Sequence, residues 1–212
     1  MLSLKKQLKE NLPFILLIVL MFSFRSSVAD WYHVPSGSME PNIQIGDRVV
    51  VDKMAYSLDV PFTNYELMST GDIERGDIVI IDSHAAKNRL IKRVVAVEGD
   101  TVSLNNNRLI INGEPARLKA INTALYKEEF SDTKRTIALS ATPSPASSFN
   151  EVVVPEGHIL AMGDNRNNSV DSRYYGFFPI SEVRGKATSI AFSVDSENYY
   201  LPRKERLFVS LE

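Results

Sequence analysis

Two serines that flank a glycine stand between two prolines at residues 35–41, where the chain reads PSGSMEP. Proline restricts the local backbone and glycine allows positive φ, so this stretch can form a turn that holds one hydroxyl outward beside a backbone N–H. In such a turn Ser38 can act as a nucleophile, while its own N–H and the Ser36 hydroxyl receive an oxyanion. A loop that only joins two parts of the chain has the same composition, so the stretch alone leaves both interpretations open.

A lysine lies among apolar residues at 89–97, where the chain reads RLIKRVVAV. Successive side chains of a β-strand point to opposite faces, so Lys92 shares its face with three apolar residues. Burial of that face lowers the pKa of a lysine because desolvation disfavours the charged form, and a neutral amine is a general base for a hydroxyl. The alternative is an edge-strand lysine whose amine reaches solvent. The neighbouring Arg93 cannot be the base because a guanidinium keeps its proton in proteins.

A third stretch, at residues 163–176, reads GDNRNNSVDSRYYG and is rich in side chains that hydrogen-bond to backbone, which is typical of a loop. It offers a carboxylate and a guanidinium, Asp171 and Arg173, and the hydroxyl of Ser169, which can orient an amine. The spacing does not fit a calcium loop. Counted from Asp164, the positions that need an oxygen ligand, a glycine and a glutamate hold arginine, serine and tyrosine.

The composition excludes several other kinds of chemistry. The chain has no cysteine, which excludes disulfides, thiolate metal sites, iron–sulfur clusters and a cysteine nucleophile. Its formal net charge of −2 gives no support for a nucleic-acid partner. There are three histidines, and their positions show neither metal-ligand spacing nor a recognisable Ser-His-Asp triad. The sequence also lacks a phosphate-binding glycine loop, so we expect neither a metal nor a cofactor.

An apolar run at residues 12–24 lies near the start of the chain. Residues 8–28 together reach the length of about 20 residues that a membrane-spanning helix needs. Lysines before the run and an aromatic pair after it favour an uncleaved anchor with a cytoplasmic N-terminus. A cleaved secretory signal peptide, with the small residues at 26–29 as its exit, is the competing interpretation. We expect residues 1–30 to form the cytoplasmic N-terminus and a transmembrane anchor.

The rest of the chain, residues 31–212, is expected to form one mostly β, extracytoplasmic catalytic domain. Its pattern is one of short apolar or alternating runs separated by turn signals. The runs that predict strands lie at 48–52, 77–81, 90–97, 102–104, 109–111, 152–154, 158–162 and 187–192. Residues 58–74 are expected to be an extended loop or hairpin, and residues 114–150 a polar, partly mobile insertion.

Taken in order, four stretches resemble the sequence boxes of the bacterial type I signal peptidases (leader peptidases), a family of Ser-Lys dyad serine proteases. PSGSMEP resembles the nucleophile box, RGDIVII at 75–81 the adjacent core strand, IKRVVAVEGD at 91–100 the lysine box, and GDNRNNSVDSRYYGFFP at 163–179 the longest signature. The resemblance runs from about residue 22 to residue 179. It implies an antiparallel β-sheet catalytic domain behind one N-terminal transmembrane helix.

The resemblance also implies a catalytic role for four residues. Ser38 matches the nucleophile and Lys92 the general base. Ser36 matches the side-chain donor to the oxyanion, beside the Ser38 N–H. Ser169 matches the hydroxyl that orients the lysine.

Other matching positions imply supporting roles. Asp171 and Arg173 match a structural salt bridge near the site. Asn167 stands where an aspartate is commoner, and we expect a local change in hydrogen bonding there without loss of activity, because nucleophile and base are intact. The residues that match the lining of the shallow substrate pockets are Tyr32, Val34, Met39, Ile43, Leu90 and Ile91.

The resulting hypothesis is a membrane-anchored serine endopeptidase that removes signal peptides from exported pre-proteins after small residues, in an A-x-A-like pattern. It would act through an acyl-enzyme, without metal or cofactor. Its partners would be those signal peptides and the lipid bilayer of the bacterial cytoplasmic membrane, near the secretion translocon, with the catalytic domain on the periplasmic side. Two alternatives remain: a peptidase with the same dyad dedicated to a pilus or conjugation component, and an inactive anchored scaffold that binds exported peptides.

Overall fold

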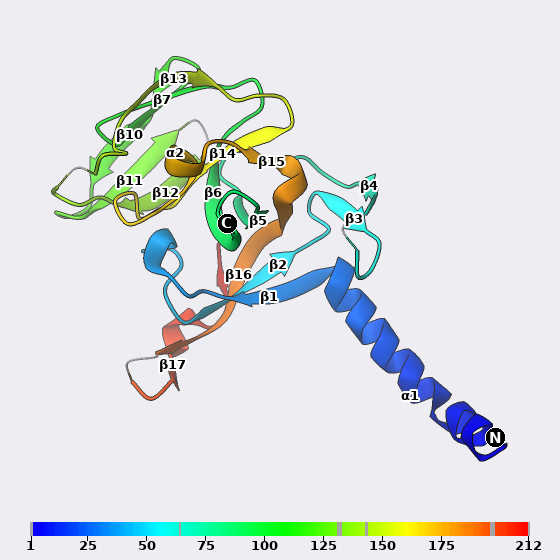
Figure 1. Cartoon of the computed structure of the whole chain (residues 1–212). Helices are drawn as coiled ribbons and strands as arrows, with labels where there is room; N and C mark the ends of the chain where they lie inside the picture. Colours follow the sequence, from blue (N-terminus) through cyan, green and yellow to red (C-terminus); the bar gives the residue numbers. More distant parts are fainter. Residues whose placement is uncertain (1, 64, 131–132, 143, 196–197, 212) are drawn as a thin grey trace.

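The computed structural model describes residues 2–63, 65–130, 133–142, 144–195 and 198–211. The chain begins with a 26-residue helix, α1 (Leu2–Ser27), which projects away from a body built almost entirely of β-strands (Figure 1). Among the described residues no helix is long and apolar enough to cross a membrane, so the predicted transmembrane anchor is not confirmed.

The last turn of α1 is bound to the body at Ser26. The carbonyl oxygen of Ser26 accepts a hydrogen bond from Lys53 Nζ, and its hydroxyl oxygen accepts one from the Phe62 N–H at 2.8 Å. Phe62 lies in the loop of a two-stranded hairpin formed by β3 (Ser57–Asp59) and β4 (Glu66–Ser69). Helix and body are therefore joined by hydrogen bonds as well as by the chain itself.

A nine-stranded antiparallel sheet forms the centre of the body, with seven strands in the order β1-β2-β16-β5-β6-β14-β15 and two short strands paired with β16. Its strands are β1 (Ala29–His33), β2 (Asp47–Asp52), β5 (Ile78–Ser83), β6 (Asn88–Val97), β14 (His158–Met162), β15 (Phe178–Pro179), β16 (Val183–Asp195), β17 (Leu201–Pro202) and β18 (Val209–Ser210). This sheet confirms the predicted mostly β, antiparallel class. Every predicted run lies at least partly in a strand of the body.

Two smaller sheets stand at the end of β6 and β14 (Figure 1). One has the order β13-β7-β8-β9, and the other the order β10-β11-β12. Their strands are β7 (Thr101–Asn105), β8 (Arg108–Ile111), β9 (Glu114–Pro115), β10 (Arg117–Ala120), β11 (Leu125–Phe130), β12 (Thr133–Ala138) and β13 (Phe149–Val153). The second sheet falls inside the stretch 114–150, which therefore contains paired strands and not only loop.

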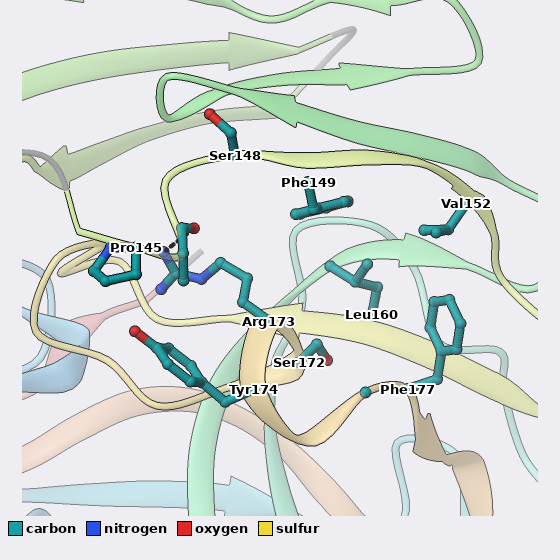
Figure 2. Close-up of a pocket in the computed structure, with 11 residues that line it drawn as sticks. Pro145, Ser148, Phe149, Val152, Leu160, Ser172, Arg173, Tyr174 and Phe177 are labelled. Carbon is teal, nitrogen blue, oxygen red and sulfur yellow. Dashed lines mark hydrogen bonds between the residues drawn. The ribbon is translucent and has the colours of Figure 1, made fainter.

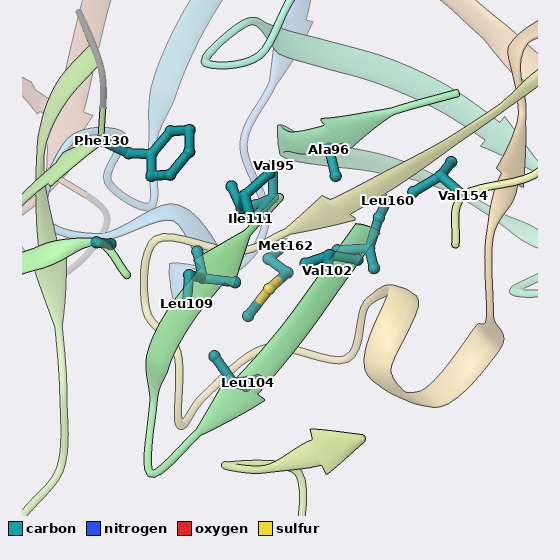
Figure 3. Close-up of a cluster of buried hydrophobic side chains, with 11 residues drawn as sticks. Val95, Ala96, Val102, Leu104, Leu109, Ile111, Phe130, Val154, Leu160 and Met162 are labelled. Carbon is teal, nitrogen blue, oxygen red and sulfur yellow. The ribbon is translucent and has the colours of Figure 1, made fainter. Parts of the chain in front are cut away.

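Three clusters of buried apolar side chains fill the body. The first lies between the four-stranded sheet and strands β6 and β14, where side chains such as Val102, Leu109 and Met162 meet (Figure 3). The second contains Met39, directly after Ser38, and the third contains Val94, two positions after Lys92. Because protein interiors are close-packed, these clusters fix the backbone on which both candidate catalytic side chains stand.

Candidate active site

Ser38 lies in a single 3₁₀ turn, η1 (Gly37–Met39), between β1 and β2. The turn is closed by the Glu40 N–H, which donates to the Gly37 carbonyl oxygen at 3.1 Å. On one side of Ser38 the Met39 side chain, 1 % exposed, packs into the second cluster. On the other side Ser36 is exposed. The half-buried Ser38 is thus held between a fixed core residue and the surface.

Lys92 stands on β6, where the register with β5 places it opposite Val79. Lys92 Nζ lies 2.8 Å from Ser38 Oγ and donates to the carbonyl oxygen of Ile91 at 3.0 Å. Lys92 is only 3 % exposed, and Arg93 on the other face of the strand is only 8 % exposed. Both faces of β6 are covered here, so Lys92 is not the edge-strand lysine of the alternative interpretation.

Burial lowers the pKa of Lys92 from its usual 10.5 to about 8. Desolvation is the largest cause, because it disfavours the charged amine. The nearby carboxylates of Asp171 and Asp164 oppose this effect without cancelling it, and the Arg173 guanidinium lowers the pKa further. A larger part of the amine is therefore neutral near neutral pH than for a solvent-exposed lysine, and this neutral part can accept a proton.

Asp171 is the centre of a buried hydrogen-bond network beside the lysine. Its carboxylate accepts from Arg173 Nε and Nη2, both at 2.8 Å, from the Gly163 N–H at 3.0 Å and from the Ser169 hydroxyl at 2.7 Å. Burial alone raises the pKa of Asp171, but the Arg173 guanidinium and these donors outweigh it and leave the pKa below its usual value. The predicted Asp171–Arg173 ion pair is present, with both side chains at most 2 % exposed.

Ser169 uses its one hydroxyl proton on Asp171, so toward Lys92 its oxygen can act only as an acceptor. Gly163 lies against both Ser169 and the nucleophile turn. A Cβ added at Gly163 would stand 2.3 Å from Ser169 Oγ and 2.4 Å from the Ser38 carbonyl oxygen. A glycine is therefore required at this point, because any side chain would collide with both residues.

The residues directly after Gly163 tie the loop to both halves of the dyad, a role that no motif had assigned to them. Asp164 accepts from Arg93 Nε at 2.9 Å and Nη2 at 2.8 Å. The Asn165 N–H donates to the Ser38 carbonyl oxygen at 3.0 Å, and Asn165 Nδ2 donates to that of Gly37 at 3.1 Å. The loop thus binds the strand of the lysine and the turn of the serine at successive positions.

The loop is also fastened to the three-stranded sheet by a buried ion-pair cluster. Glu128 on β11, 1 % exposed, accepts from Arg166 Nη1 at 2.9 Å and Nη2 at 2.5 Å, and from Arg135 Nε at 2.6 Å. Asn167 Oδ1 accepts from the Ser140 N–H at 2.9 Å. An aspartate oxygen could accept the same hydrogen bond, so asparagine in place of aspartate at residue 167 keeps this contact.

The six residues predicted to line substrate pockets fall into two groups. Val34, Met39 and Ile43 are at most 2 % exposed and belong to the second apolar cluster. The three partly buried residues are Tyr32, Leu90 and Ile91. The ring of Tyr32 also lies under the guanidinium of Arg89, 4.5 Å from ring centroid to Cζ.

A cavity of about 390 Å³ lies beside the salt bridge of the site. Figure 2 shows Arg173, Tyr174, Phe149 and Leu160 around it. Arg173 Nη1 donates to the carbonyl oxygen of Ala146, which also lines the cavity, at 3.4 Å. Its other lining residues are Pro145, Ser148, Val152, Ser172, Gly176 and Phe177. In the part of the chain that the structure describes, no group of three His, Cys, Asp or Glu side chains is arranged to hold a metal ion.

The chain matches the family model for signal peptidase, peptidase S26, over residues 8–192. It is similar to Signal peptidase I of Pseudomonas aeruginosa, with 32 % identity across 92 % of this chain and 75 % of that one. Probable signal peptidase I-2 of Synechocystis is 34 % identical, across 80 % of this chain and 66 % of that one. A crystal structure of a signal peptidase I from Enterococcus faecalis V583 is 30 % identical, covers 55 % of this chain and 97 % of that one, and has a TM-score of 0.37.

Proposed function

Because the chain belongs to the signal peptidase family, peptidase S26, and is a serine peptidase that removes signal peptides, we propose that Ser38 and Lys92 are its catalytic dyad. The observation that carries this proposal is the 2.8 Å distance from Lys92 Nζ to Ser38 Oγ, at a lysine that is 3 % exposed. A buried amine of lowered pKa next to a hydroxyl is the arrangement that activates a serine nucleophile.

Acylation begins when neutral Lys92 takes the hydroxyl proton of Ser38 while Oγ attacks the carbonyl carbon of the scissile peptide bond. With a pKa of about 8, roughly a tenth of the amine is neutral at pH 7. The carbonyl oxygen becomes an oxyanion, which the Ser38 N–H and the Ser36 hydroxyl receive. Loss of one such donor typically costs about 10²–10³ in rate.

The tetrahedral intermediate collapses when the C–N bond breaks and the leaving amine takes the proton that Lys92 carries. The signal peptide remains bound to Ser38 as an ester, and the mature protein departs with a new N-terminus. Lys92, neutral again, takes a proton from a water molecule whose oxygen attacks the ester carbon. Collapse of this second intermediate returns the proton to Ser38 Oγ and releases the signal peptide as a carboxylic acid.

The proposed substrate is an extended peptide that ends in small residues at the cleavage site. β1 is the first strand in the order of the central sheet, and an extended peptide would lie along it in a strand-like conformation. Tyr32, on β1, and Leu90 and Ile91, on β6, are the partly buried apolar residues that would contact its alternate side chains. No cofactor is needed for any of these steps.

We also propose that α1 attaches the enzyme to the bacterial cytoplasmic membrane, with the catalytic body on the periplasmic side near the translocon. The support is the apolar side chains that α1 exposes, such as Leu16, Leu20 and Phe22, at 59 %, 68 % and 51 %. Attachment at the membrane would hold Ser38 near the surface where precursors emerge. Fractionation of cells that express the full chain and a chain lacking residues 1–28 tests this point.

The dyad is tested by processing of an exported precursor with the full chain and the variants Ser38→Ala and Lys92→Ala. We expect each variant to stop cleavage while keeping the fold, which circular dichroism checks. Ser148→Ala, a serine outside the dyad, is the matched control and should cleave normally. Normal cleavage by either dyad variant would refute the proposal.

The two competing functions are separated by simple measurements. Covalent labelling of Ser38 by a serine-directed acylating probe, absent in Ser38→Ala, rules out an inactive peptide-binding scaffold. Cleavage of several unrelated secretory precursors rules out an enzyme dedicated to one pilus or conjugation component. Cleavage confined to one such component would support it instead.

A further inference from the structure

Asn165 holds two consecutive carbonyl groups of the nucleophile turn. Its backbone N–H donates to the Ser38 carbonyl oxygen at 3.0 Å, and its side-chain Nδ2 donates to the Gly37 carbonyl oxygen at 3.1 Å. Its own backbone is fixed on both sides, because Ala138 accepts from the Arg166 N–H at 3.0 Å and donates to the Asp164 carbonyl oxygen at 2.9 Å. Asn165 is therefore held in place by its neighbours and in turn holds the three-residue turn that contains Ser38.

The bond to Gly37 controls the direction of the proposed oxyanion donor. The carbonyl of Gly37 and the N–H of Ser38 belong to one planar trans peptide unit, in which the C=O and N–H point in opposite directions. Fixing the carbonyl oxygen on Asn165 Nδ2 therefore fixes the N–H on the far side of the plane. Among the described residues the Ser38 N–H has no hydrogen-bond partner, so this donor is free for a ligand.

We infer that Asn165 is a positioning residue that aims the Ser38 N–H at the oxyanion of the tetrahedral intermediate. The inference rests on the proposed function, since it assigns a role in that reaction. Asn165 acts through the peptide plane and touches neither the nucleophilic oxygen nor the lysine amine in the contacts described. The Gly37 oxygen keeps its second bond, from the Glu40 N–H at 3.1 Å, so without the side chain of Asn165 the turn still forms but its peptide plane is less fixed.

The test uses Asn165→Ala, which removes the side-chain donor and keeps the backbone N–H, and Asn165→Leu, which keeps the side-chain shape without a donor. Asn168→Ala is the matched control, because Asn168 is an exposed asparagine of the same loop. Initial rates are measured on a synthetic signal-peptide substrate with the full chain in detergent. Each rate is divided by the folded fraction of that protein, which is determined by thermal unfolding, to give a corrected kcat.

We expect kcat to fall about 10- to 100-fold in both Asn165 variants, with KM within about 2-fold of wild type and the pH of half-maximal rate unchanged. A peptide aldehyde, which places an oxyanion in the same position once bound to Ser38, should lose affinity by the same factor as kcat. The Asn168→Ala control should match wild type in all of these quantities.

Three results would overturn the inference. One is a corrected kcat within about 2-fold of wild type in both Asn165 variants. Another is a rise in KM without a fall in kcat or in affinity for the aldehyde, which would mean that Asn165 acts in substrate binding. The third is a shift of the pH profile, which would mean that Asn165 acts on Lys92. If wild type cleaves, Ser38→Ala does not and Asn165 is indifferent, this inference fails while the proposed function stands. If wild type itself cleaves no precursor, both fail.

Discussion

Lys92 and Ser38 approach each other to 2.8 Å from two different elements, a strand of the central sheet and a turn between two others. An ammonium has three N–H donors, and the two oxygens near Nζ, those of Ser38 and Ile91, cannot replace its full hydration. The fold therefore makes the charged amine less favourable than it is in water. The electrostatics of this pair leads to two predictions, one for rate and one for stability.

Cleavage should depend on the ionisation of Lys92. Because the base must be neutral, we expect kcat/KM to rise with pH through about 8, the pKa of Lys92, and to level off above it. Initial rates between pH 6 and pH 10 on a peptide without titratable groups provide the measurement. A rate that is flat from pH 6 to pH 10 would contradict a lysine base.

Removal of the amine should stabilise the protein while it abolishes activity. The pKa of Lys92 is about 8 in the fold and 10.5 as a reference, so folding releases a proton between these values and the free energy of unfolding rises with pH in that window. Below it, burial of the charged form costs on the order of 3 kcal/mol. We therefore expect Lys92→Met to be more stable than wild type in urea at pH 7, by up to about that amount, with a smaller difference at pH 10. The exposed Lys119→Met is the control and should show neither effect.

Gly163→Ala should disable the site by steric collision alone. The added methyl group would stand 2.3 Å from Ser169 Oγ and 2.4 Å from the Ser38 carbonyl oxygen, so one of these must move. A displacement of about 1 Å at a reacting group can cost about 10²-fold, and we expect at least that loss in kcat/KM. Gly99→Ala is the contrasting control: Gly99 has φ +81° and open space around it, so strain of about 1 kcal/mol should lower stability and leave activity intact. Equal activities of the two variants would contradict this account.

Glu128→Gln should destabilise the body and change its response to acid. The substitution leaves Arg166 and Arg135 buried without their shared carboxylate, and breaking a buried pair typically costs about 3–5 kcal/mol. Although burial raises the pKa of Glu128, the two guanidinium groups lower it from 4.5 to about 2. Wild type should thus lose stability as pH falls from 4.5 towards 2, and the variant should lose less over that range. Urea unfolding at pH 6, 4 and 3 measures both effects, with the exposed Glu114→Gln as control.

The strands and the candidate dyad could be predicted because their signals are local. Alternating or continuous apolar runs mark β2, β5, β6 and β14, and the core clusters are made from them. The serine turn and the lysine strand carry motifs that a single sequence displays. Their meeting at 2.8 Å is a tertiary property, which the family resemblance implied and the strand pattern alone did not.

The three-stranded sheet and the supporting contacts could not be predicted in the same way. β10 and β11 are rich in charged residues, so no apolar pattern predicts these strands. The buried Glu128 of β11 pairs with Arg166, which lies in a loop far along the chain. Asn165 donates to the backbone carbonyl oxygens of Gly37 and Ser38, and Gly163 leaves room for that of Ser38. Contacts with backbone atoms leave no complementary side chain in the sequence. For Ser169 the motif gave a position, but the direction of its hydroxyl proton, toward Asp171, is visible only in the fold.

Lys53 and Phe62 both donate hydrogen bonds to Ser26 at the last turn of α1, and these bonds restrict rotation of the helix against the β body. A change in the tilt of α1 therefore changes the orientation of the β body. A surface that orients α1 therefore also orients the turn that carries Ser38. A flexible glycine–serine spacer placed after residue 27 would uncouple the orientation of the helix from that of the turn.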